Sequence, residues 1–329
     1  MAVAVKERTR KQEQEPEQAV AEKPAAATKK PSSLKAVVPE KIEKRLKLFL
    51  YGPSGVGKTI AAIMFPRAYI LDTEKGADYY GEMIKQSGSV IFQSNDYNEI
   101  KRELETLLTE DHSYKTLIID PITIIYQTIQ DFWMKRFKQD AVEKNKGGNA
   151  DLNDPGMRFW GKVKSDYKAL QRLILKLDMN VIVTAHLKDV YGNNFNKIGV
   201  APDSMRGDDY FFDLVFRMEK RGKDRYAITE KERAEIGKNK FPEEFIWTYE
   251  NFKKFYGAET LERKAKPVAM ATKEQIVQIT GLLETVKVEQ DWIDKIMTKA
   301  DVDGWHELTF DQIQKCLDFL LKKLNGVKS

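Results

Sequence analysis

An apolar strand that runs into a glycine-rich turn constrains the fold of this chain more than any other feature. Residues 48–51 read L-F-L-Y, and residues 52–59 read G-P-S-G-V-G-K-T. This matches G-x-x-x-x-G-K-[ST], in which glycines let the backbone close around phosphate groups while N–H groups, a lysine and a hydroxyl neutralise them. The apolar, helix-forming residues 60–64 follow. A chance match in a glycine-containing turn would not require an apolar strand before it and a helix-forming run after it. The pattern therefore predicts a nucleotide-binding site.

The motif gives its last two residues distinct roles. We expect Lys58 to reach the β- and γ-phosphates and Thr59 to place its hydroxyl on Mg²⁺. The residues expected around the nucleotide are Gly52, Pro53, Ser54, Gly55, Val56, Gly57, Lys58, Thr59 and Ile60.

Length and composition bound the class of protein. With 329 residues, 42% of them hydrophobic, the chain can bury one substantial core and a small second domain. A net charge of +5 permits a polyanionic partner without proving one. The single cysteine, Cys316, excludes a disulfide framework within one chain and fits a reducing, cytoplasmic setting. No apolar run has membrane-spanning length, so no membrane partner is expected.

Strands alternate with helices through the middle of the chain. Residues 1–40 are polar, without periodicity, and read as a disordered arm. Residues 41–257 have short apolar runs between helical patterns, which predicts a parallel sheet covered on both faces. The predicted strands are Lys47–Tyr51, Ala68–Asp72, Val90–Gln93, Thr116–Asp120, Val181–Ala185, Leu214–Glu219 and Tyr226–Thr229. The predicted helices include Lys58–Met64, Tyr97–Thr109 and a long one at about Met157–Lys176.

The C-terminal part differs in pattern. Residues 258–271 are polar, contain Pro267 and read as a linker. Residues 272–329 read as a small helical module, which begins with a capping box formed by Thr272 and Gln275.

Three further strand ends carry polar side chains. Asp120 ends an apolar strand about sixty residues after the glycine-rich loop and is expected to hold Mg²⁺. Glu74 follows the strand Ala68–Asp72, where a carboxylate beside the phosphate-loop strand can deprotonate the attacking water; a surface salt bridge or turn cap is the alternative. His186 ends the strand that begins at Val181 and is expected to face the γ-phosphate, unless it is only structural.

In this order, these residues resemble the RecA-like branch of P-loop ATPases over residues 47–240. The resemblance implies an α/β fold, with a RecA-like P-loop core of mostly parallel sheet between helices plus the small C-terminal helical module. It also implies ATP and Mg²⁺ as cofactors, Glu74 as the catalytic base and Asp120 as the magnesium ligand. The family's sensor is usually glutamine, so His186 is a departure. The phage RecA-like single-strand annealing proteins are similar, including the T-A-H sequence at 184–186.

The resemblance implies two DNA-binding loops, at residues 144–149 and 189–207. Both are rich in Gly and Asn and match neither a helix nor a strand pattern. Aromatic faces can stack on bases and cations can bind phosphates, although ordinary surface loops also carry such residues. The residues expected to contact DNA are Lys144, Lys146, Lys188, Tyr191, Phe195, Lys197 and Arg206.

The segment Lys231-Glu232-Arg233 matches a K-x-R element of hexameric helicases in this superfamily. There the cations enter the neighbouring subunit's active site, so Lys231 and Arg233 are expected to act in trans. An ordinary charged surface segment is the alternative.

The sequence therefore predicts a Mg²⁺-dependent, DNA-stimulated ATPase that assembles as a ring or filament on single-stranded DNA. The expected process is strand annealing or exchange in phage recombination, in the host cytoplasm, with a single-strand DNA-binding protein as a further candidate partner. Two alternatives remain open: a hexameric helicase-like motor, and a nucleotide-dependent scaffold without DNA activity.

Overall fold

The computed structural model describes residues 45–144, 156–193, 195–233 and 237–326. The predicted disordered arm at residues 1–40 lies outside these ranges. No helix within them is long and apolar enough to cross a membrane.

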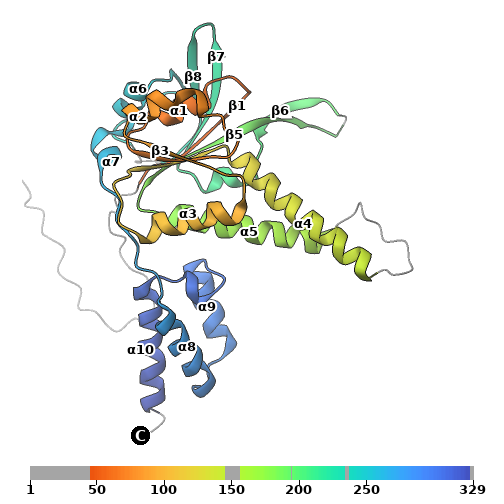
Figure 1. The fold of residues 1–329 in the computed structure, drawn as a ribbon, viewed down its shortest axis with the longest axis vertical. Coiled ribbons are helices and arrows are strands. Elements are labelled where there is room, and N and C mark those ends of the chain that lie inside the picture. Colours follow the sequence, from red (N-terminus) through yellow and green to blue (C-terminus); the bar gives the residue numbers. More distant parts are fainter. Residues whose placement is uncertain (1–44, 145–155, 194, 234–236, 327–329) are drawn as a thin grey trace, which may run out of the picture. The chain divides into compact units, whose positions relative to one another are not determined.

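A single sheet organises the described part of the chain (Figure 1). Its strand order is β3-β2-β4-β5-β1-β7-β8-β9, and β6 pairs with the far end of β5. The pairs from β3 to β7 are parallel, and the β7–β8, β8–β9 and β5–β6 pairs are antiparallel. The strands are β1 (Lys47–Gly52), β2 (Ala68–Asp72), β3 (Val90–Gln93), β4 (Thr116–Asp120), β5 (Asn180–Tyr191), β6 (Lys197–Pro202), β7 (Leu214–Arg221), β8 (Asp224–Glu232) and β9 (Glu244–Ile246).

Helices cover both faces of the sheet. In Figure 1, α3, α4 and α5 lie on one side of it and α1, α2 and α6 on the other. Side chains of β1 alternate between two cores, since Phe49 and Tyr51 pack with the first set and Leu48 and Leu50 with the second. The predicted α/β fold with a mostly parallel sheet between helices is thus confirmed. The helices are α1 (Lys58–Ile63), α2 (Gly81–Gln86), α3 (Tyr97–Thr109), α4 (Ile122–Lys144), α5 (Gly156–Lys176), α6 (Tyr249–Tyr256), α7 (Ala258–Glu262), α8 (Lys273–Thr285), α9 (Gln290–Ala300) and α10 (Phe310–Gly326).

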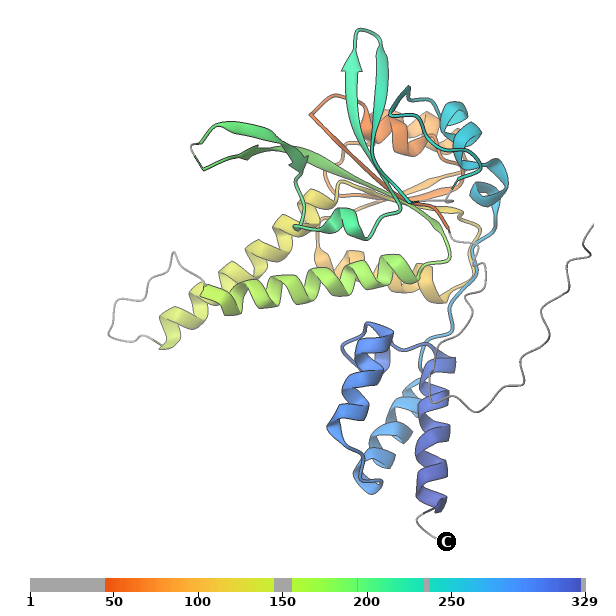
Figure 2. The ribbon, with the colours of Figure 1, turned by 180° about the vertical axis from the view of Figure 1, so that it is seen from behind.

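Two details of the sheet correct the sequence-based prediction. The strand that leads to Glu74, β2, is not beside the phosphate-loop strand, because β4 and β5 lie between β2 and β1. The second predicted loop, 189–207, is not irregular throughout. Strand β5 continues past His186 to Tyr191 and pairs with β6, so most of this segment is a β-hairpin, which we call the β5–β6 hairpin. It extends away from the helix-covered part of the sheet (Figure 2).

The segment predicted as a linker is in part ordered against the core. It contains α7, whose Leu261 is buried, and the Asn180 side chain donates a hydrogen bond of 2.8 Å to the Leu261 carbonyl. Beyond α7, the Val268 N–H donates to the Leu108 carbonyl at 2.7 Å. These hydrogen bonds satisfy backbone groups of the segment and fix it against the core.

Helices α8, α9 and α10 enclose a separate small core. Ile279, Leu317 and Leu320 are fully buried there. The predicted capping box is confirmed, because the Thr272 hydroxyl accepts from the Gln275 N–H at 3.2 Å and the Gln275 amide oxygen accepts from the Thr272 N–H at 3.1 Å.

Candidate active site

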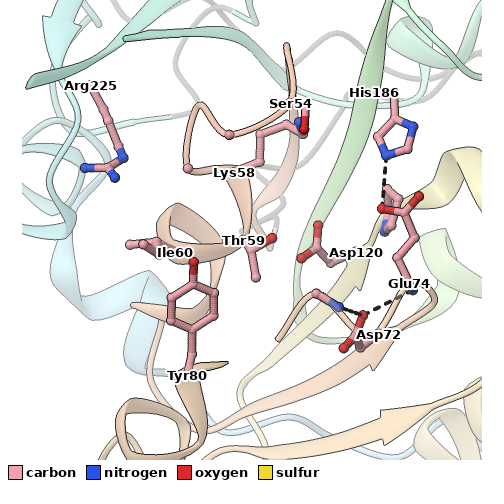
Figure 3. A pocket seen from close by; sticks show the side chains of 14 residues that line it. Ser54, Lys58, Thr59, Ile60, Asp72, Glu74, Tyr80, Asp120, His186 and Arg225 are labelled. Carbon is pink, nitrogen blue, oxygen red and sulfur yellow. Dashed lines mark hydrogen bonds and ion pairs between the residues drawn. The ribbon is translucent and has the colours of Figure 1, made fainter. Parts of the chain in front are cut away.

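A cavity of about 350 Å³ opens where β1, β2 and β4 end, beside the middle of β5 (Figure 3). The register of the sheet creates it. Gly52 lies opposite His186, and Asp72 lies opposite Asp120, so the loops that follow β1, β2 and β4 meet next to His186. The residues that line the cavity are Ser54, Gly55, Gly57, Lys58, Thr59, Ile60, Asp72, Glu74, Gly76, Tyr80, Asp120, Pro121, His186 and Arg225.

The phosphate loop requires glycine at two positions for different reasons. A Cβ on Gly52 would lie 2.7 Å from the Met218 carbonyl oxygen, because the strand end packs closely on β7. Gly57 has a φ of +96°, in the left-handed region that side chains rarely adopt. Val56 is buried in the core instead of facing the cavity.

Lys58 is the cation of the loop. Its ammonium group donates to the carbonyls of Gly52 at 2.9 Å and Pro53 at 3.1 Å. Partial burial lowers the pKa of Lys58, and the nearby charges of Asp120 and Glu74 oppose that shift. Further negative charge nearby would stabilise the charged form of Lys58. The phosphates of a nucleotide would supply that charge.

Asp120 and Thr59 fit a magnesium ion. The Asp120 carboxyl is buried and accepts a hydrogen bond from the Thr184 hydroxyl, and Thr59 lines the same cavity. Its pKa is raised, chiefly by burial and further by the charge of Asp72. A buried carboxylate next to a hydroxyl offers the hard oxygen ligands that Mg²⁺ prefers, and a cation there would favour the charged carboxylate.

Asp72 shapes the loop that carries Glu74. Its carboxylate accepts hydrogen bonds from the backbone N–H groups of Glu74 at 3.2 Å, Gly76 at 3.1 Å and Ala77 at 3.1 Å. These bonds turn the chain sharply after β2 and direct Glu74 toward the cavity (Figure 3). The aspartate is therefore a positioning residue for the predicted base.

His186 contacts that predicted base directly. Its Nε2 lies 3.1 Å from the Glu74 carboxylate, and both side chains are 39% exposed. The backbone of His186 is held as well. Its N–H donates to the Thr123 hydroxyl at 3.0 Å, and its carbonyl accepts from the Asp203 N–H at 2.8 Å. Since Asp203 follows β6, the histidine joins Glu74 to the base of the β5–β6 hairpin.

Tyr80 and Arg225 line the cavity, but no sequence motif predicts them as site residues. Tyr80 ends a short 3₁₀ turn, Asp78–Tyr80, after the Glu74 loop. Arg225 comes from β8, far along the chain. Arg225 reaches the phosphate loop because of the register between β7 and β8. That register is a property of the folded sheet, so the sequence alone does not predict Arg225 as a site residue.

Comparison with known protein families identifies the family of the chain. A family profile described as an AAA domain matches residues 44–241, more than half of the chain. The chain belongs to this AAA-domain family. It is therefore a nucleoside triphosphatase by family, with the fold described above.

One similar solved structure is the crystal structure of the RadB recombinase. It shares 19% sequence identity over 67% of this chain and 90% of that one, with a TM-score of 0.36. No curated protein matches the chain.

In this AAA-domain protein, Lys231 and Arg233 do not line the cavity of their own chain. Lys231 donates to the Asp209 carbonyl. The Arg233 guanidinium lies 3.2 Å from the nearly buried Asp213 carboxylate and donates to the Tyr210 carbonyl at 3.1 Å. Both residues lie on or just after β8, which is longer than predicted.

The residues predicted to contact DNA fall into two groups. On the β5–β6 hairpin, Phe195 is 90% and Tyr191 58% exposed, so both rings face solvent. Lys188 pairs with Asp203 at 3.4 Å and Lys197 with Asp189 at 2.7 Å. The other predicted loop, with Lys146, lies outside the described residues, and Lys144 is the last residue of α4.

Proposed function

We propose that this protein is a Mg²⁺-dependent ATPase whose turnover is coupled to single-stranded DNA in recombination, with strand annealing or exchange as the outcome. The observation that carries the proposal is the contact between Glu74 and His186 at 3.1 Å, since the same histidine is bonded to the base of the β5–β6 hairpin. A conformational change in the β5–β6 hairpin would be transmitted to Glu74 through His186.

The chemistry assigns a task to each cavity residue. Lys58 neutralises the β- and γ-phosphates, and Thr59 with Asp120 would hold Mg²⁺, which supplies further positive charge to the triphosphate. Glu74 accepts the proton of the water that attacks the γ-phosphate. Asp72 fixes the loop that presents Glu74, and His186 holds the carboxylate in place.

The hairpin supports the choice of single-stranded DNA as partner. Exposed aromatic rings at Tyr191 and Phe195 provide faces on which unpaired bases can stack, a contact that is indifferent to sequence. Arg206 is exposed after the hairpin and is available for phosphate contacts. To contact DNA phosphates, Lys188 and Lys197 must first break their ion pairs with carboxylates of the hairpin. This reduces the binding free energy that each lysine contributes.

The test of this proposal is the ATP hydrolysis rate of the full chain with and without single-stranded DNA. We expect stimulation by single-stranded DNA and annealing of complementary strands. Equal rates with and without DNA would favour a nucleotide-dependent scaffold, and unwinding of a duplex would favour a helicase-like motor.

The hairpin cations give a second prediction. Replacing Lys197 and Arg206 together with alanine should weaken single-strand affinity and lower the salt dependence of binding by about one to two released counterions. ATP binding without DNA should not change. Fluorescence anisotropy at several salt concentrations measures both quantities.

A matched control comes from α6, where Lys253 pairs with Glu250 and Lys254 is exposed. The double variant Lys253→Ala/Lys254→Ala removes the same charge elsewhere and should bind DNA as the wild type does. If the hairpin variant also keeps its affinity and salt slope, this hairpin is not the DNA site.

The trans role of Arg233 gives a third prediction. Arg233→Ala subunits and Lys58→Ala subunits should each be nearly inactive, and mixing them should restore part of the ATPase activity. Some mixed interfaces combine an intact phosphate loop with an intact arginine from the neighbour. The measurement is the ATPase rate as a function of mixing ratio.

Mixing Lys58→Ala with Glu74→Gln subunits is the control, because both changes damage the site of their own chain and no interface is repaired. If the Arg233→Ala mixture restores nothing although the two variants co-assemble, Arg233 acts only in its ion pair with Asp213.

A further inference from the structure

Arg225 lies against the phosphate loop although it comes from a strand that β7 separates from β1. It belongs to β8, where the Trp247 N–H donates to its carbonyl at 2.7 Å and fixes the strand position. Its side chain occupies the space beside Gly57. A Cβ built on Gly57 would lie 2.1 Å from the Arg225 Nε, 2.8 Å from its Cδ and 3.1 Å from its Cζ. The guanidinium therefore packs directly on the loop backbone and lines the cavity.

The Arg225 guanidinium has no anionic partner among the described residues. Its Nε is buried without a hydrogen-bond acceptor in this part of the chain, and none of the ion pairs found there includes it. The two other arginines of the hairpin formed by β7 and β8 do have anionic partners. Arg217 pairs with Glu219 and Glu230, and Arg221 pairs with Glu219 and Glu244. A partly buried guanidinium without a partner is costly, and it is satisfied by an anion that enters the cavity.

The arrangement of the cavity indicates which part of the nucleotide this anion belongs to. In Figure 3, Arg225, Ile60 and Tyr80 lie on one side of Lys58 and Thr59, and Glu74 and His186 lie on the other. The proposed function directs the γ-phosphate toward Glu74. The end of the triphosphate nearer to the ribose then extends toward Arg225.

We propose that Arg225 binds the α- and β-phosphates of the nucleotide in its own subunit. This inference rests on the proposed function for the placement of the γ-phosphate. Arg225 is then a binding residue for the part that ATP and ADP share. Since it contacts groups that substrate and product share, it contributes to the binding of both. The same contact connects the nucleotide to β8, the strand that carries Lys231.

The test compares Arg225→Ala with Lys223→Ala, which removes an exposed cation from the turn of the same hairpin. Titration calorimetry gives affinities for ADP and for inorganic tripolyphosphate, each with Mg²⁺. The affinity for ATP is measured in the Glu74→Gln background, so that hydrolysis does not interfere. We expect Arg225→Ala to weaken all three ligands by roughly 10- to 100-fold, as for loss of a charge-assisted hydrogen bond. The kcat/KM for ATP should fall by a similar factor, and Arg225→Lys should recover part of the affinity.

Other results would overturn the inference. Unchanged ADP affinity in a folded Arg225→Ala variant would remove Arg225 from the site while leaving the proposed ATPase intact. Weaker ATP binding with normal ADP binding would assign Arg225 to the γ-phosphate. Loss of ADP and ATP affinity with normal tripolyphosphate affinity would assign it to the ribose or base. A wild-type chain that binds no nucleotide would refute the proposed function first, and this inference with it.

Discussion

Glu74→Gln is expected to leave ATP binding intact and to lower turnover by roughly 10²- to 10⁴-fold, the range typical of a lost general base. Glutamine keeps the size of the side chain and can still accept a hydrogen bond from His186, which lies 3.1 Å from the carboxylate in the wild type. It cannot accept the proton of the attacking water. The loop geometry should persist, because Asp72 holds it through backbone N–H groups. Single-turnover phosphate release, with ATP affinity measured in parallel, separates binding from chemistry.

Glu82→Gln is the matched control, since Glu82 is exposed in the first turn of the nearby α2 and does not line the cavity. It should hydrolyse ATP at the wild-type rate. Wild-type turnover by Glu74→Gln would instead move the base to another residue of the cavity, where Asp72 and Asp120 are the other carboxyl groups in the described part of the chain.

Lys58→Ala is expected to weaken ATP binding by roughly 10²-fold or more and to abolish measurable hydrolysis, because several charge-assisted contacts to the β- and γ-phosphates are lost together. Arg225 and Lys58 are the cationic side chains that line the cavity in the described part of the chain, and in our account Arg225 serves the other end of the triphosphate. The measurements are ATP affinity and the steady-state rate. Thermal unfolding should change little, since within the described residues the ammonium group donates to carbonyls of the loop itself.

Lys85→Ala, on the exposed side of α2, removes an equal charge outside the cavity and should behave as the wild type. Hydrolysis at the wild-type rate by Lys58→Ala would show that the glycine-rich loop is not the site of catalysis.

Local sequence predicted the elements that depend on local pattern. The strands Ala68–Asp72, Val90–Gln93 and Thr116–Asp120 have the predicted bounds, and so does the helix Tyr97–Thr109. Short apolar runs are typical of buried strands, as Ala68–Asp72 and Thr116–Asp120 are, although the edge strand Val90–Gln93 is largely exposed. Asp96 caps α3 by accepting two backbone N–H bonds. The glycine-rich loop, Glu74, Asp120 and His186 do meet in one cavity.

Helix α4 was missed because its first residues are β-branched. The run Ile122-Thr123-Ile124-Ile125 has a strand-like composition, and such residues lower helix propensity. In the structure Ile122, Ile125 and Ile129 are buried along one side of the helix. Tertiary burial therefore outweighs local preference at this position.

The remaining features depend on which segments become neighbours. The contact between Glu74 and His186 requires the order of β2, β4 and β5 in the sheet, which local pattern does not contain. Arg225 requires the antiparallel register of β7 and β8, which has an irregularity between Val215 and Phe216. A one-residue slip of that register would turn Arg225 to the other face of the sheet.

The most direct test of the account is an experimental structure of the Glu74→Gln variant with ATP and Mg²⁺. We expect the triphosphate in the cavity where β1, β2 and β4 end beside β5, with Lys58 at the β- and γ-phosphates and Mg²⁺ near Thr59 and Asp120. We also expect the γ-phosphate on the side of residue 74 and His186, and Arg225 at the opposite end. Nucleotide bound outside this cavity, or bound there with its γ-phosphate directed toward Arg225, would contradict it.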